Sequence, residues 1–144
     1  MITLSQKKMN LCNQLENGQK LIDMKQYDDA QKLFSHMASE LEKQENFPQK
    51  HIWLSEIYNN LGFLLYKKVE FNKAQSFYKK SMEINPSFAP AYYNYGVIDY
   101  RLSLFESAIR YFRKAVQLNP ENPEFAAGLQ ASEIALYQNN ELIT

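Results

Sequence analysis

Ser55–Asn122 decides the fold, because this stretch holds one pattern twice. Ser55–Phe88 reads SEIYNNLGFLLYKKVEFNKAQSFYKKSMEINPSF, and Ala89–Asn122 reads APAYYNYGVIDYRLSLFESAIRYFRKAVQLNPEN. Small residues and a proline recur with a step of 34 residues, in the pairs Gly62 and Gly96, Ala74 and Ala108, and Pro86 and Pro120. A fixed period of this length predicts repeated supersecondary units stacked side by side.

Each copy has the spacing of two helices. Tyr58, Leu61, Gly62 and Leu65 follow the i, i+3, i+4, i+7 rule for one helix face, and the second half does the same from Ala74. A short turn at Val69-Glu70 must reverse the chain, which makes an antiparallel hairpin. The glycine and the alanine remove bulk where the two helices meet, so aromatic rings of the facing helix can pack over them.

A weaker copy precedes these two. Gly18 and Ala30 are 12 residues apart, as are Gly62 and Ala74, but the step from Gly18 to Gly62 is 44 residues. About ten residues are therefore inserted, and the polar stretch 41–51 is the natural place. We expect one domain over residues 1–144, with repeats at about 11–44, 55–88 and 89–122 and a closing helix at about 123–140.

Composition limits the classes of function. The chain has 144 residues, enough for one compact domain. Its 16 basic and 16 acidic residues cancel, which argues against a nucleic-acid or anionic-membrane partner. Cys12 is the only cysteine, and no apolar run suits a signal peptide or a membrane span. These features predict a cytoplasmic protein, with nuclear residence left open.

These residues resemble the tetratricopeptide repeat family, whose small residue in the first helix, early alanine in the second and terminal proline match Gly62, Ala74 and Pro86. The match recurs one repeat later, and the resemblance covers about residues 11–122. It implies an all-α fold, a right-handed superhelix of three helix hairpins with a C-terminal capping helix. It also implies a non-enzymatic scaffold or adaptor.

The resemblance further implies that the first helix of each hairpin lines a concave groove that binds peptides. Residues offset by one or two positions from the hairpin core would face this groove. They are Gln19, Ile22 and Asp23 in the first repeat, Asn59, Asn60, Phe63, Tyr66 and Lys67 in the second, and Tyr93, Asn94, Val97, Tyr100 and Arg101 in the third.

The chemistry of this set favours another protein or peptide as partner. Asn60 and Asn94 offer a donor and an acceptor each to a peptide backbone. Lys67 and Arg101 suit an acidic side chain or a terminal carboxylate. Two alternatives stay open: the rings of Tyr66 and Tyr100 could pack between repeats, and the amides could bond between helices.

Some family members hold a chaperone C-terminal carboxylate with a fixed set of Lys, Asn and Arg. That pattern falls here on Leu15, Gln19, Asn60, Pro90 and Asn94, and only Asn60 keeps the family's residue. The usual form of this carboxylate site is therefore not expected.

Asp99 breaks the repeat, because it stands where the preceding copy has the apolar core residue Leu65. A buried lone carboxylate is costly, so it should be paired, hydrogen-bonded or partly wet. One interpretation is a satisfied carboxylate near the closing helix. The other is a polar contact to a partner.

Chemistry for catalysis is sparse. His36 and His51 stand apart from each other and from Cys12, so no zinc cluster or cysteine–histidine pair is expected. No glycine-rich phosphate loop occurs. We therefore predict no enzyme activity, no metal and no cofactor. The alternative to a groove-binding adaptor is a structural subunit that self-associates, or joins a larger complex, through its ends or its convex face.

Overall fold

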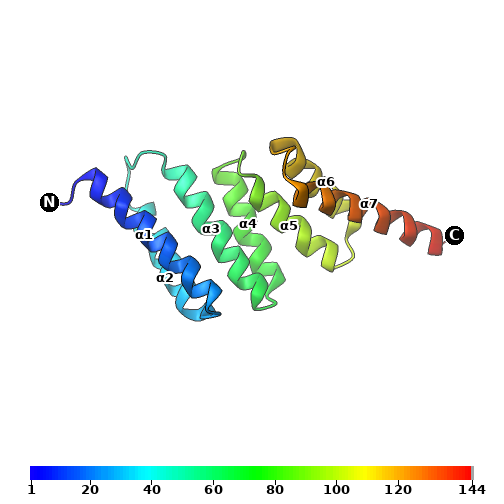
Figure 1. The fold of residues 1–144 in the computed structure, drawn as a ribbon, viewed down its shortest axis with the longest axis horizontal. Helices are drawn as coiled ribbons and strands as arrows, with labels where there is room; N and C mark the ends of the chain where they lie inside the picture. The colour runs from blue at the N-terminus through cyan, green and yellow to red at the C-terminus, as the bar shows by residue number, and fades with distance from the viewer. Residues whose placement is uncertain (144) are drawn as a thin grey trace.

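The computed structural model describes residues 1–143, and these residues form helices and turns without a strand. Seven helices follow one another: α1 (Leu4–Asp23), α2 (Tyr27–Glu42), α3 (Lys50–Lys67), α4 (Phe71–Ile84), α5 (Ala89–Arg101), α6 (Phe105–Leu118) and α7 (Pro123–Ile143). Figure 1 shows them as successive antiparallel pairs along one axis, with the termini at opposite ends. The predicted all-α solenoid of three hairpins with a capping helix is confirmed.

Small residues bring the two helices of each hairpin together, as predicted. A Cβ atom placed on Gly62 would lie 2.5 Å from a ring carbon of Tyr78. Gly96 meets the ring of Phe112 in the same way, and Gly18 meets that of Phe34. In each hairpin the aromatic residue follows its glycine by 16 positions. The weak first copy therefore uses the same contact as the two strong copies.

One turn geometry closes all three hairpins. Lys25, Val69 and Ser103 have positive φ angles of 61°, 63° and 61°. The residue after each donates its backbone N–H to a carbonyl five positions earlier, at 2.8, 2.9 and 2.8 Å. This pattern satisfies helix-end carbonyls by placing a left-handed residue just past the helix. Because none of the three is glycine, the sequence gave no signal for this conformation.

The inserted segment connects α2 to α3 through residues 43–49. The Lys50 ammonium donates to the carbonyls of Glu42 and Gln44, at 2.9 Å each, and ties the loop to the end of α2. α3 begins two residues after Pro48. At the other end of α1, Thr3 and Gln6 form a reciprocal capping box, so this helix begins at Leu4, well before residue 11.

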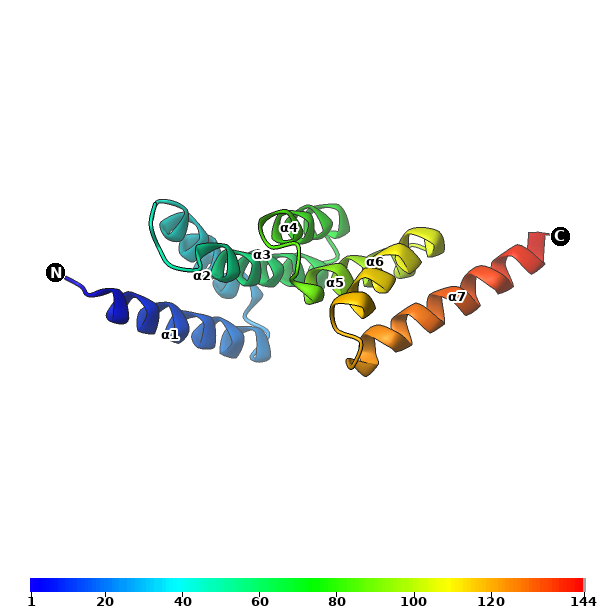
Figure 2. The ribbon, with the colours of Figure 1, turned by 90° about the horizontal axis from the view of Figure 1, so that it is seen from above.

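The closing helix α7 packs with its first half. Phe125 is buried, whereas Ile134 and Tyr137 in the second half are exposed. Figures 1 and 2 show this half extending past the end of α6. None of the described helices combines the length and apolar character needed to cross a bilayer.

Asp99 is a satisfied buried carboxylate. Only 2% of its surface is exposed, and it accepts hydrogen bonds from Gln75 Nε2 at 2.8 Å and Ser107 Oγ at 2.6 Å. These donors come from α4 and α6 and not from the closing helix. The carboxylate therefore joins three helices of the second and third repeats, which supports the structural interpretation of this residue.

Candidate functional site

The solenoid curves so that its two end helices lie on the same side. Figure 2 shows α1 and α7 displaced toward one side of α3 and α5, while α4 lies on the other side. The first helices of the hairpins therefore face the hollow side of the molecule. This curvature places the candidate groove residues of α3 and α5 between the two end helices.

Five of the predicted groove residues converge on one cavity of about 300 Å³. Its lining comes from four helices: Tyr66 on α3, Tyr93, Val97, Tyr100 and Arg101 on α5, Phe112 on α6, and Gly128 and Ala131 on α7. The lining is mostly aromatic, and one guanidinium stands among the rings. A concave, largely apolar pocket with few polar groups is the usual form of a ligand site.

α7 supplies the wall that the sequence did not predict. Gly128 stands 34 residues after Asn94, and a Cβ atom there would lie 2.9 Å from the ring of Phe112. Phe112 is therefore held between Gly96 and Gly128 and forms part of the pocket lining. The available signal was a glycine in helix context at the repeat spacing.

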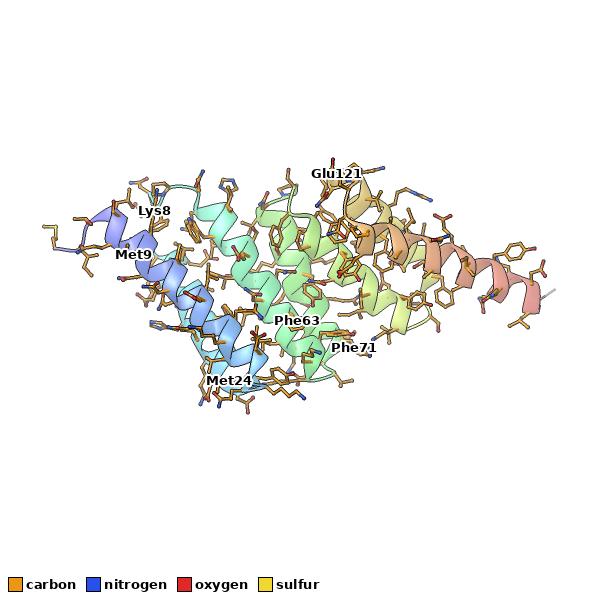
Figure 3. All side chains as sticks on the ribbon, in the orientation of Figure 1. Lys8, Met9, Met24, Phe63, Phe71 and Glu121 are labelled. Atoms are coloured by element: carbon orange, nitrogen blue, oxygen red, sulfur yellow. The ribbon has the colours of Figure 1, made fainter. Side chains whose placement is uncertain are left out.

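Aromatic residues continue the site along α3. The Tyr66 ring stacks on Phe63 and on Phe71, with centroid distances of 6.2 and 5.8 Å. Figure 3 shows Phe63 and Phe71 near the same end of the α3–α4 hairpin. Tyr100 packs against Phe105 of its own repeat and is 40% exposed. The tyrosines thus pack against neighbours and still line the cavity.

Two cations lie over these rings. The Lys67 ammonium is 5.4 Å from the Phe63 centroid, and the Arg101 guanidinium is 5.2 Å from that of Tyr66. Such contacts favour cations over aromatic faces. Neither cation has an ion-pair partner among residues 1–142. Both charges therefore stand at the groove without a carboxylate beside them.

Burial also affects the tyrosine in the pocket. The pKa of Tyr93 is raised, first by burial of its hydroxyl and then by the negative charge of Glu124 and by Tyr66. Its ring lies 5.0 Å from that of Phe125 and 5.5 Å from that of Phe112. Tyr93 is therefore a neutral, fixed part of the lining at physiological pH.

The amides do not act as predicted. Asn94 donates to Asn59 Oδ1 at 3.0 Å, which links α5 to α3 across the repeat boundary. Asn60 is half-buried on α3. In the first repeat, Gln19 donates to Asp23 at 3.0 Å, and Ile22 is buried. None of these five residues lines the cavity.

The positions of the family's chaperone-carboxylate site hold no cation here. They carry Leu15, Gln19, Asn60, Pro90 and Asn94, and Asn94 is engaged by Asn59. Within residues 1–142, no three His, Cys, Asp or Glu side chains lie close enough to share a metal ion.

The hairpins, the recurrent glycine contact and the hollow face define an α-solenoid of two-helix units. Tetratricopeptide repeat models match residues 55–88 and 89–122. The chain belongs to the tetratricopeptide repeat family. No curated protein sequence matches it.

Solved structures share the fold at low sequence identity. The first repeat domain of Spaghetti (RPAP3), solved with an HSP90 peptide, is 20% identical with a TM-score of 0.72, covering 88% of this chain and 93% of that chain. The C-terminal domain of a Plasmodium falciparum FK506-binding protein is 19% identical with a TM-score of 0.74, covering 97% of each chain. The Aspergillus fumigatus Sgt2 domain is 14% identical with a TM-score of 0.75, covering 92% and 82%.

Proposed function

We propose that this protein is a non-enzymatic adaptor that binds a peptide segment of another protein in its hollow face. The observation that carries the proposal is the cavity of about 300 Å³ in which Tyr66, Tyr93, Tyr100 and Arg101 meet α7. The HSP90 peptide bound to the Spaghetti domain, a structure of the same fold, supports a peptide as the kind of ligand.

The chemistry of the pocket describes the peptide. Aromatic walls and the small residues Gly128 and Ala131 leave room for a large apolar side chain. Arg101, and Lys67 on α3, would meet an acidic side chain or a C-terminal carboxylate beside it. The partner is therefore a protein with an apolar anchor residue near an acidic group.

A peptide library tests the proposal. Random nine-residue peptides, with free or amidated C-termini, would be selected on the wild-type chain, and their affinities measured by fluorescence anisotropy. In the variant Ala131→Leu the added side chain fills the cavity, and Arg101→Gln removes the charge. We expect each variant to weaken binding by at least about tenfold, as loss of a central contact does.

The control is Arg113→Gln, which removes the same charge from an exposed position on α6. It should leave the affinities unchanged. Peptides that bind all three variants as tightly as wild type would place the ligand elsewhere. Failure to select any peptide would contradict the proposal as a whole.

A further inference from the structure

The second half of α7 is an exposed helix with an apolar centre and acidic flanks. Tyr137 and Ile134 are 67% and 50% exposed. Glu133, Tyr137 and Glu141 are spaced four residues apart, so they share one stripe of the helix. α7 also carries Glu124 and contains no Lys or Arg. A projecting apolar surface of this kind marks an interaction site.

The opposite end of the solenoid carries a recess of about 280 Å³. It lies between the start of α1 and the end of α2, where the inserted loop covers it. Its apolar lining is Leu11, Met37, Leu41 and Phe47. Around it Ile2 and Leu4 are exposed by 59% and 46%. The recess is separate from the hollow face and shares no lining residue with the aromatic cavity.

The charges of the two ends are complementary. Lys7 and Lys8 lie in the first half of α1, where Leu4–Asn13 contains no acidic residue. Neither lysine has an ion-pair partner within residues 1–142, and Lys7 Nζ reaches only Gln44, at 3.4 Å. Glu40, which also lines the recess, is neutralised by Lys43 at 3.3 Å. The recess therefore combines an apolar floor with a positive rim.

We propose that the exposed half of α7 docks into this recess on a second copy of the chain, so that the copies associate head to tail. The ring of Tyr137 enters among Leu11, Met37 and Phe47, where aromatic and methionine side chains pack well. Glu133 and Glu141, one turn to either side of Tyr137, meet Lys7 and Lys8. Such charge pairs set the orientation of the contact.

The geometry of this contact determines its products. The two surfaces differ, and Figure 1 places them at opposite ends of the molecule. A contact between different surfaces generates open chains unless the rotation closes a ring. One helix in one recess is at the small end of specific interfaces, so the expected dissociation constant is micromolar in order of magnitude. The average mass should therefore rise steadily with concentration, without stopping at two copies.

Two blocked variants test the proposal. Tyr137→Glu blocks the α7 surface, and the double variant Lys7→Glu, Asn10→Glu blocks the recess. Each should be monomeric by sedimentation velocity, at concentrations where the wild-type chain forms oligomers. Mixed together, each retains one working surface, so the mixture should form a dimer of one chain of each and nothing larger.

The controls make equivalent changes elsewhere. Lys79→Glu reverses a charge on α4, and Met24→Glu replaces an exposed apolar residue at the far end of α1. Both should associate like wild type, and circular dichroism would verify that every variant is folded. A wild-type chain that stays monomeric up to hundreds of micromolar, in order of magnitude, would overturn the proposal. A dimer that plateaus and persists when the recess is blocked would also overturn it, because that result indicates a symmetric contact.

Discussion

At the scale of the residue, Gly62 and Gly96 differ in how much space their neighbours leave. A Cβ atom at Gly62 would lie 2.5 and 2.6 Å from ring carbons of the buried Tyr78 and 3.1 Å from the Ala74 carbonyl oxygen. At Gly96 the nearest ring atoms of Phe112 are 3.0 to 3.2 Å away. The same sequence signal therefore marks a tight contact in one repeat and a looser one in the next.

This difference predicts unequal responses to alanine. Alanine gains about 1 kcal/mol of helix propensity over glycine, whereas overpacking a core costs about 1–3 kcal/mol. We expect Gly62→Ala to destabilise the protein by about 1–2 kcal/mol and Gly96→Ala to lie near zero. Urea unfolding followed by circular dichroism measures both. If Gly62→Ala were as stable as wild type, the close contact would not limit the packing.

At the scale of the element, Asp99 predicts how α4, α5 and α6 are joined. Asp99→Leu restores the apolar residue of the preceding repeat, but it leaves the Gln75 amide and the Ser107 hydroxyl without their acceptor. An unsatisfied buried polar group costs about 1–3 kcal/mol. We therefore expect the single variant to lose stability, although the sequence alone would suggest a gain.

A combined variant separates the carboxylate from its partners. Replacing all three residues, in Asp99→Leu, Gln75→Leu, Ser107→Ala, removes the donors together with the acceptor. Such exchanges are often neutral or stabilising. The triple variant should regain most of the stability that the single variant loses, as measured by urea unfolding. A triple variant as unstable as Asp99→Leu would assign the loss to shape and not to hydrogen bonds.

The elements show what could be predicted from the sequence and why the rest could not. Helices and their pairing followed from the 34-residue step, because the packing of glycine against a ring repeats with it. The turn conformation at Val69 left no trace, since its hydrogen bonds are made by the backbone. The aromatic half of the groove was predicted because its residues occupy one face of α3 and α5. The wall from α7 was missed because it depends on where that helix docks.

The amides show a limit of another kind. Asn59 and Asn94 were both placed on the hollow face, yet they bond to each other across the boundary between two repeats. Sequence spacing gives the face of a single helix, but not the distance to a side chain on the next one. A polar residue near a helix interface can therefore satisfy a neighbour or a ligand, and only the packing decides which.

At the scale of the whole molecule, tyrosines from α3 to α5 predict how stability depends on alkaline pH. Burial raises the pKa of Tyr58, Tyr78, Tyr92 and Tyr93, and it raises the pKa of Tyr95 to about 12, with the nearby Tyr111 and Asp99 adding to the shift. An unfolded tyrosine releases its proton near pH 10. Below that pH the folded and unfolded chains bind these protons equally, so their contribution to stability is complete. Between about pH 10 and pH 12 the unfolded chain loses protons that the folded chain keeps, so the free energy of unfolding must fall as pH rises.

Tyr95→Phe tests this account, because it removes one of the linked protons and keeps the ring that stacks on Tyr111 at 4.0 Å. The slope of unfolding free energy against pH, measured by urea unfolding from pH 9.5 to 11.5 in order to span the window, should become shallower than in wild type. One tyrosine can contribute at most about 1.4 kcal/mol per pH unit, and the half-exposed setting of Tyr95 reduces this value. Tyr137→Phe is the matched control, since that side chain is exposed and its loss should leave the slope unchanged. Equal slopes for wild type and Tyr95→Phe would mean that the Tyr95 hydroxyl loses its proton as readily in the folded solenoid as in the unfolded chain.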